Sequence, residues 1–398
     1  MKLSPLLQER QWRVFWRVPH DKTIWHKMSL ISRLYKGKKV LVTGHTGFKG
    51  SWLSLWLKHL GAQVVGVSID VPSEPSHFIS ANISSEIEDY RLDICDSEKI
   101  KEIINKVEPD IVFHLAAQAL VRPSYENPLQ TLNTNAIGTA NLLEGLRLLE
   151  EPVIAVMITS DKAYDNVEWV WGYRETDPLG GKDPYSASKG MAELVIRSFN
   201  ESFFSLPGSN VRIGIARAGN VIGGGDWAKD RIVPDCMTAW SNNRIVDIRS
   251  PLATRPWQHV LEPLSGYLLL GADLLKSPRF SGEAYNFGPN ANQNHSVSQL
   301  IDEMRQYWDK VQWNDVSKSR EHVHEAGLLK LNCDKALFNL KWEPTLEFEE
   351  TIKMTVEWYK KYYQNIELSQ SVSMYDFTIS QIKEYTQSAK NRGIIWAK

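Results

Sequence analysis

Tyr185 and Lys189, four residues apart, could carry acid–base chemistry on one face of a helix. A neighbouring ammonium favours the phenolate, so we expect the pKa of Tyr185 to be lowered from its ordinary value of about 10. A tyrosine shifted toward neutrality can take the proton of a hydroxyl group. That base is useful only if another group accepts the hydride leaving the same carbon. The chain must therefore also supply a site for a hydride acceptor.

The glycine run at residues 44–50, Gly-His-Thr-Gly-Phe-Lys-Gly, offers such a site between a short apolar run and a helical pattern. Glycines let the chain turn tightly and approach a pyrophosphate, and the following helix supplies free N–H groups. Asp70 ends the next apolar run, where a carboxylate accepts hydrogen bonds from an adenosine ribose and repels a 2′-phosphate. The pattern therefore favours NAD over NADP. Taken alone, Asp70 reads equally well as an ordinary turn residue.

Apolar runs and helical patterns alternate along the first half of the chain. Strands without polar alternation belong to parallel sheets covered on both faces. The sequence therefore predicts an α/β fold, a Rossmann-type doubly wound parallel sheet. We expect strands at 39–43, 63–69, 110–115, 153–159 and 211–216, and helices near 52–60, 98–107, 129–149 and 185–203.

Glycine and proline become frequent after about residue 218, where we expect shorter helices and isolated strands. The predicted organisation is a weakly ordered leader (1–37), a cofactor domain (38–218) and a smaller C-terminal α/β substrate lobe (219–398). Part of this lobe is expected to return to the main sheet.

The composition is ordinary for a globular protein: 398 residues, 42% hydrophobic and 23% charged, with a net charge of -1. This balance argues against a nucleic-acid partner, and no apolar run is long enough to span a bilayer. Cys95, Cys236 and Cys333 are too far apart for a disulfide framework, which favours a cytoplasmic setting. The pair His322 and His324 lacks a second ligand cluster, so no metal is predicted.

The leader is strongly basic, with ten Lys or Arg against two acids in residues 1–39. It has no continuous apolar segment, which argues against a secretory signal. A transit peptide or an interfacial helix is one alternative. The preferred interpretation is a weakly ordered extension ahead of a start at Met28.

The glycine spacing, the run His114-Leu-Ala-Ala-Gln118, Asn135 and the Tyr-x-x-x-Lys motif resemble the extended short-chain dehydrogenase/reductases. Within them, longer runs resemble the nucleotide-sugar 4,6-dehydratases, and more narrowly the branch that acts on CDP-glucose. These runs are residues 44–53, 159–164, 219–227 and 255–260. The resemblance extends from about Lys38 to near the C-terminus.

The resemblance implies a bound NAD that is reduced and re-oxidised within one turnover. The residues that would hold it lie in the glycine run and at later strand ends. They are Gly44, Thr46, Gly47, Phe48, Lys49, Gly50, Asp70, Asp93, Ile94, Ala116, Ala117, Gln118, Asn135, Tyr185 and Lys189. For Asp93, the N-cap of the helix near Glu98 is a nearly equal alternative.

The resemblance also implies catalytic roles. Tyr185 would deprotonate the 4-hydroxyl as hydride leaves C4, and Lys189 would hold the nicotinamide ribose. Ser160 would bond the 4-oxygen, and Asp161 would protonate the leaving 6-hydroxyl, which requires a raised pKa. Lys162, where many relatives carry Glu, would be the C5 base or a cation that stabilises the enolate. Neighbouring strand residues face opposite ways, so residues 160–162 can reach one sugar only if the strand ends there.

Three residues match family positions that contact the nucleotide of the substrate: Asn220, Arg231 and Arg255. Arginine suits a diphosphate because its planar fork donates two hydrogen bonds. For Arg231, a surface ion pair with Asp230 is the alternative.

The resemblance implies a homodimer formed through the Tyr185 helix and the preceding one. The apolar residues of the Tyr185 helix fit that interface, but they equally fit an intramolecular core. They are Met191, Leu194, Val195 and Phe199.

Three other functions stay open from the sequence. A nucleotide-sugar 4-epimerase would keep Tyr185, Lys189 and NAD without needing the Asp161–Lys162 pair. A dTDP- or GDP-sugar 4,6-dehydratase is a nearer alternative. A non-catalytic NAD-binding sensor is disfavoured because Tyr185 and Lys189 are both present.

Overall fold

The computed structural model of the chain describes residues 30–317, 328–368 and 372–398. Its main sheet has seven strands in the order β3-β2-β1-β4-β5-β6-β11, all parallel. The order changes direction between β1 and β4, as in doubly wound sheets, so the predicted Rossmann-type fold is confirmed. The strands are β1 (Lys39–Thr43), β2 (Gln63–Ser68), β3 (Glu88–Arg91), β4 (Ile111–His114), β5 (Val153–Ile158), β6 (Val211–Ala218) and β11 (Ala284–Phe287).

The central strands are apolar throughout because helices cover both faces of the sheet. In β5 every residue is buried, and Met157 joins one core while Val156 joins the other. Each fully buried aliphatic side chain of this kind contributes about 1.5–3 kcal/mol. One face packs against α6 (Ser97–Val107), α9 (Gly138–Arg147) and α10 (Pro184–Phe199), and the other against α4 (Phe48–His59) and α12 (Leu261–Lys276).

The predicted helix 129–149 is divided into α8 (Pro128–Leu132), a π-helical turn (Asn133–Ile137) and α9. Helix α10 also runs into a π-helical turn, Asn200–Phe204. Such turns insert one residue into a helix and often occur at functional sites. The first of them carries Asn135.

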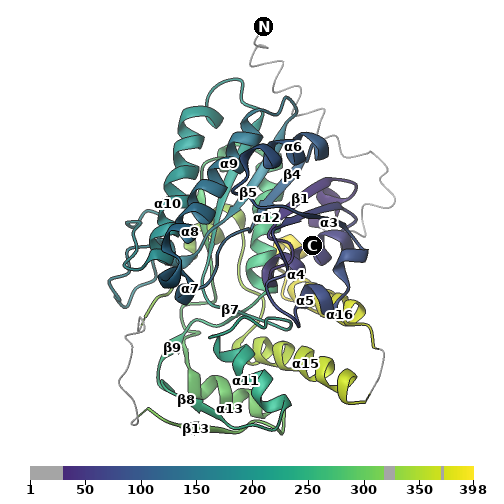
Figure 1. Cartoon of the computed structure of the whole chain (residues 1–398), viewed down its shortest axis with the longest axis vertical. Coiled ribbons are helices and arrows are strands. Elements are labelled where there is room, and N and C mark those ends of the chain that lie inside the picture. Colours follow the sequence, from purple (N-terminus) through teal and green to yellow (C-terminus); the bar gives the residue numbers. More distant parts are fainter. Residues whose placement is uncertain (1–29, 318–327, 369–371) are drawn as a thin grey trace.

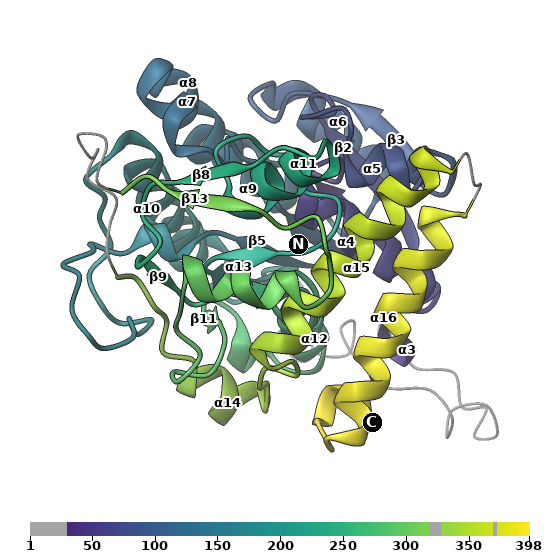
Figure 2. The same ribbon diagram turned by 90° about the horizontal axis from the view of Figure 1, so that it is seen from below.

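The expectation of shorter helices after residue 218 is wrong. Helices α12, α15 (Phe348–Glu367) and α16 (Met374–Asn391) have 16, 20 and 18 residues, and α15 and α16 lie side by side (Figure 2). Helix α12 is buried on nearly all sides and so lacks an amphipathic pattern. It packs on β5 and β6 of the main sheet. The division at residue 218 stays a prediction.

The remaining elements after residue 218 are short. Several gather beyond one end of the main sheet, with α15 beside them (Figure 1). The short elements after residue 218 include β7 (Val221–Ile222), α11 (Ile232–Ser241), β8 (Val246–Ile248), β9 (Thr254–Arg255), β10 (Gln258–His259), β12 (His295–Ser296), α13 (Val297–Arg305), β13 (Trp313–Asp315) and α14 (Asp334–Leu340).

The end of the predicted leader is a helix, α3 (Leu30–Tyr35), rather than a weakly ordered segment. Ile31 and Tyr35 are buried, and the Tyr35 hydroxyl donates to the carbonyl of Leu268 in α12 at 2.8 Å. The sequence around α3 does not reveal this packing, because the contact with α12 is made by residues far away in the chain. The rest of the leader (1–29) and the pair His322 and His324 lie outside the described residues.

Candidate active site

The predicted site residues of the first half of the chain follow the carboxyl ends of the parallel strands. This edge of a doubly wound sheet is where ligands bind, at the point where the strand order reverses. The glycine run follows β1, residues 115–118 follow β4, and residues 159–163 follow β5. The topology therefore brings segments far apart in the sequence to one edge.

The glycine run forms a tight turn that only glycine permits at two positions. Gly44 has a φ of +76°, and a Cβ there would lie 2.6 Å from the Ala116 nitrogen. A Cβ on Gly50 would lie 2.1 Å from the Gly44 carbonyl oxygen. Gly47 is the N-cap of α4 and offers no side-chain cap, so first-turn N–H groups remain for an anion. This geometry fits the pyrophosphate of a dinucleotide.

Thr46 and Asp70 tie the glycine turn to the end of β2. The Thr46 hydroxyl donates to the Asp70 carbonyl oxygen at 2.6 Å, while the Asp70 side chain is exposed just beyond the strand. An exposed carboxylate at this strand end suits a ribose hydroxyl.

Asp93 and Ile94 follow β3. The alternative that Asp93 caps helix α6 is wrong, because Asp96 is the N-cap and accepts from the Lys99 N–H at 3.2 Å. Asp93 instead accepts the Cys95 N–H at 2.9 Å. The Ile94 side chain is buried in the core, so Ile94 could contact a ligand only through its backbone atoms.

Asn135 braces the segment after β4 from within the protein. Its amide oxygen accepts the Gln118 N–H at 2.8 Å, and its amide nitrogen donates to the Gln118 carbonyl and to the Ser188 hydroxyl. Both amide donors are thus used. Ala116, Ala117 and Gln118 are half-buried beside the glycine turn.

Helix α10 presents Tyr185 and Lys189 on one buried face. Asp183 caps the helix by accepting the Ser186 N–H at 2.9 Å, and Pro184 occupies its first turn. Tyr185 and Lys189 are 8% and 6% exposed, and the Lys189 ammonium lies 6.0 Å from the centroid of the Tyr185 ring. The predicted pair is therefore held together out of bulk water.

The expected lowering of the Tyr185 pKa is wrong for the protein alone. Burial raises the pKa of Tyr185 to about 12, against a hydrogen bond from Ser160 and the charge of Arg231, which lower it. Burial also lowers the pKa of Lys189 to about 8. Desolvation outweighs the neighbouring charges because both groups lie in the interior.

The segment 160–162 bends as the predicted chemistry requires. Strand β5 ends at Ile158, and Asp161–Ala163 form a 3₁₀ turn capped by the Ser160 side chain. The Ser160 hydroxyl donates to the Asp161 carboxylate at 3.0 Å, and Lys162 is half-buried beside it. Burial raises the pKa of Asp161, the direction that a general acid needs.

Lys49 lies in the glycine turn and also interacts electrostatically with the candidate catalytic residues Asp161 and Lys189. Burial and the positive charge of Arg231 lower the pKa of Lys49 to about 8, while the charge of Asp161 opposes that change. The Lys49 charge in turn acts on Lys189. Its position in the glycine run had indicated only a cofactor contact.

The three substrate candidates are distributed over the lobe after β6. Arg231 pairs with Asp226 at 2.8 Å, and Asp230 pairs with Arg122 instead, so the proposed Arg231–Asp230 pair is wrong. The sequence reasoning missed Asp226, although it stands in the run 219–227 that carries the resemblance.

The positive charge of Arg231 lowers the pKa of Tyr185. The Asn220 carbonyl accepts the Gln258 N–H at 3.2 Å, which joins its segment to β10. Arg255 ends β9, and its guanidinium donates to the Thr254 carbonyl at 2.8 Å. The structure thus places Arg231 near the candidate base Tyr185, Asn220 directly before β7, and Arg255 at the end of β9.

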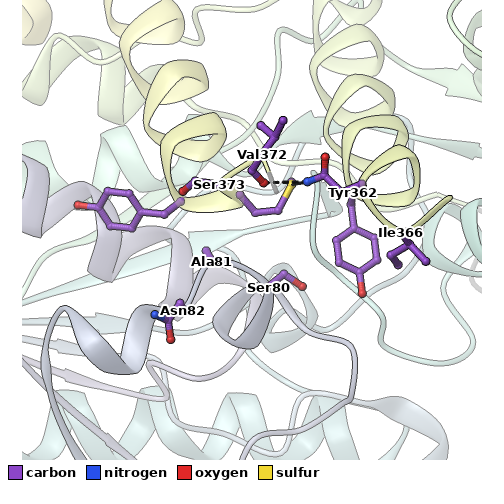
Figure 3. A pocket seen from close by; sticks show the side chains of 10 residues that line it. Ser80, Ala81, Asn82, Tyr362, Ile366, Val372 and Ser373 are labelled. Atoms are coloured by element: carbon purple, nitrogen blue, oxygen red, sulfur yellow. Dashed lines mark hydrogen bonds between the residues drawn. The ribbon is translucent and has the colours of Figure 1, made fainter. Parts of the chain in front are cut away.

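A pocket of about 430 Å³ lies elsewhere, between α5 (His77–Ser80), α15 and α16 (Figure 3). Tyr362 and Ile366 line it from α15, and Ser80 lines it from α5. None of its lining residues was predicted to be a site residue. Across the described ranges, no three His, Cys, Asp or Glu side chains are grouped for a metal ion, and no helix there is long and apolar enough to cross a membrane.

The comparisons with known proteins identify the family to which the chain belongs. The family profile described as GDP-mannose 4,6 dehydratase matches residues 41–355. A CDP-glucose 4,6-dehydratase of Salmonella typhimurium is 48% identical over 345 residues, covering 85% of this chain and 92% of that protein. A mouse dTDP-D-glucose 4,6-dehydratase is 27% identical over 338 residues, covering 82% and 90%. The solved structure of an epimerase from Methanothermobacter thermautotrophicus has a TM-score of 0.71 and 26% identity, covering 85% and 97%.

The doubly wound sheet, the glycine turn and the Tyr185–Lys189 pair define an extended short-chain dehydrogenase/reductase. Within that class, the matching profile and the 48% identical relative narrow the assignment. The chain belongs to the nucleotide-sugar 4,6-dehydratase family.

Proposed function

We propose that the chain converts CDP-D-glucose to CDP-4-dehydro-6-deoxy-D-glucose and water, with NAD as its cofactor. The observation that carries this proposal is one buried group of side chains, in which the Ser160 hydroxyl donates to the Asp161 carboxylate at 3.0 Å and Ser160 also lowers the pKa of Tyr185. A base for one hydroxyl and an acid for another are thereby linked through a single serine. The name of the 48% identical relative supports CDP-glucose as the substrate.

The residues present fit NAD. The N-terminus of α4 and the turn from Gly44 to Gly50 would hold the pyrophosphate, and Asp70 the adenosine ribose. Lys189 would hold the nicotinamide ribose, at the buried end of the site. When bound, NAD supplies a hydride acceptor for C4 and a donor for C6.

The protein's own groups would then move the protons. Tyr185 takes the proton of the 4-hydroxyl, while the Ser160 hydroxyl hydrogen-bonds the 4-oxygen. The 4-keto group makes the C5 proton acidic. Lys162 takes that proton and returns it to C5 when hydride reaches C6, or it stabilises the enolate as a cation while another base takes and returns the proton. Asp161, whose pKa burial raises, would donate a proton to the leaving 6-hydroxyl. Arg231, Arg255 and Asn220 would bind the nucleotide diphosphate.

The substrate and the reaction are tested together with CDP-glucose carrying deuterium at C4. We expect purified protein to form a 4-keto-6-deoxy sugar, seen by its absorbance in alkali, with the deuterium in the new methyl group. The dTDP, GDP and UDP hexoses serve as the comparison panel. A hexose inverted at C4 would instead identify an epimerase, and loss of the label to solvent would contradict the internal hydride return.

We further propose that the protein acts as a homodimer in the cytoplasm. Cys95, Cys236 and Cys333 are free thiols, which supports a reducing compartment. Met191 and Leu194 on α10 are 41% and 54% exposed, which argues against a purely intramolecular role for them. Leu129, 79% exposed, lies on α8, a helix that packs against α10.

Leu194→Glu should convert the dimer into a monomer, because an unpaired charge buried in an interface costs about 2–5 kcal/mol. Light scattering after size-exclusion chromatography measures the mass. Phe338→Glu is the matched control, since Phe338 lies on α14 and is 77% exposed. A dimer that persists in Leu194→Glu, or that dissociates equally in Phe338→Glu, contradicts the proposed interface.

A further inference from the structure

We propose that the buried Arg217–Glu193 ion pair is a positioning device that fixes the turn carrying Asp161 relative to Tyr185 and Lys189. The inference rests on the proposed function, because it assigns a purpose in that reaction to a charged pair that the proposed mechanism does not use. Arg217 and Glu193 are each 1% exposed.

Glu193 belongs to the face of α10 that carries the candidate catalytic pair. Tyr185, Lys189 and Glu193 are spaced four residues apart, so their side chains follow one another along the helix. The negative charge of Glu193 opposes the lowering of the Lys189 pKa by burial. Glu193 therefore acts on the catalytic helix both by position and by charge.

Arg217 joins this helix to the end of β6 through a two-pronged contact. Its Nε and Nη2 donate to the two carboxylate oxygens of Glu193 at 2.7 and 2.9 Å. The Thr159 hydroxyl also donates to Glu193, at 2.5 Å. Because Thr159 directly precedes Ser160, the ion pair holds the near side of the acid-bearing turn.

The same guanidinium holds the far side of the turn. Its Nη1 donates to the Tyr164 hydroxyl at 2.7 Å, and that hydroxyl donates to the Asn286 amide oxygen of β11 at 2.8 Å. Tyr164 directly follows the 3₁₀ turn Asp161–Ala163. The buried ion pair thus contacts both flanks of the turn, Thr159 through Glu193 and Tyr164 through Arg217.

Stability alone is a poor reason for such a pair. Desolvation of two charges offsets most of their attraction, and well-packed apolar residues of similar volume often stabilise a protein as well or better. What the pair supplies is a fixed geometry, since a bidentate guanidinium–carboxylate contact sets both distance and orientation. Catalysis depends on such geometry, because a misplacement of 1 Å can cost about 10²-fold in rate.

The test uses Tyr164→Phe, which removes one hydroxyl and leaves the Arg217–Glu193 pair in place. The matched control is Tyr35→Phe. It also removes a buried hydroxyl, which donates at the same 2.8 Å to the Leu268 carbonyl and joins α3 to α12 rather than supporting the Asp161 turn. Hydrogen–deuterium exchange of the backbone amides of residues 159–164 is measured beside kcat and KM. In Tyr164→Phe we expect faster exchange in that segment and a kcat reduced about tenfold, with KM within about twofold of wild type.

The outcomes separate this inference from the proposed function. Unchanged exchange, or faster exchange with unchanged kcat, overturns the positioning role, as does an equal effect in Tyr35→Phe. If wild-type protein turns over no nucleotide hexose, the proposed function fails instead, and the exchange data alone decide whether Tyr164 secures the turn. Arg217→Lys keeps the charge but loses the two-pronged contact, and it should reproduce the kcat loss.

Discussion

Tyr185→Phe should lower kcat/KM by about 10²–10⁴-fold, the usual contribution of a general acid or base. Phenylalanine keeps the ring that fills this buried position and removes only the hydroxyl that Ser160 contacts. The fold and NAD binding should therefore be retained. Formation of the 4-keto product measures the rate, and quenching of tryptophan fluorescence by added NAD measures cofactor binding.

Tyr35→Phe is again the control for the loss of a buried tyrosine hydroxyl, and its activity should stay within about twofold of wild type, as for a change away from the site. A Tyr185→Phe protein that keeps more than a tenth of wild-type activity would contradict the assigned role. A variant that has lost NAD affinity would show that Tyr185 serves mainly to bind the cofactor.

The raised pKa of Tyr185 means that its role as a base depends on nearby positive charge. In the protein alone, the phenol would be almost fully protonated at neutral pH, because its pKa is about 12. A base of this kind needs positive charge close to its oxygen when it reacts. Lys189 lies on the same face, and Arg231 already lowers the Tyr185 pKa. Removing the Lys189 charge should therefore reduce activity without unfolding α10.

The parts of the fold that local patterns encode could be predicted from the sequence. The five apolar strands became β1, β2, β4, β5 and β6, and the glycine run became the turn before α4. Helix α12 escaped prediction because burial on all sides removes the amphipathic period. Helix α3 escaped because its partner, Leu268, lies 233 residues away.

The candidate site was predictable as a set of residues but not as an electrostatic environment. Spacing places Tyr185 next to Lys189, but only the folded structure shows how strongly burial acts on the pKa of each. The same holds for ion pairs. Asp230 is adjacent to Arg231 in sequence, and yet the pair forms with Asp226, because chain neighbours need not point toward each other.

Asp161→Asn should separate the oxidation from the elimination. Asparagine matches the shape of aspartate and cannot donate a carboxylic proton to the leaving 6-hydroxyl. We expect kcat for dehydration to fall by about 10²–10⁴-fold. Tyr185 and Lys189 remain in place, so oxidation at C4 should continue. Mass spectrometry should then find a 4-keto hexose that has kept its 6-hydroxyl, and reduced cofactor should build up.

The control for Asp161→Asn is Asp165→Asn, four residues further on, where the aspartate is exposed. Burial raises the Asp161 pKa, the direction that a general acid needs, whereas the Asp165 side chain is exposed to solvent. Asp165→Asn should therefore dehydrate the sugar at the wild-type rate. If Asp161→Asn also dehydrates at that rate, the proton comes from another group, and Lys49 is the next candidate because burial lowers its pKa to about 8 and Asp161 lies within its field.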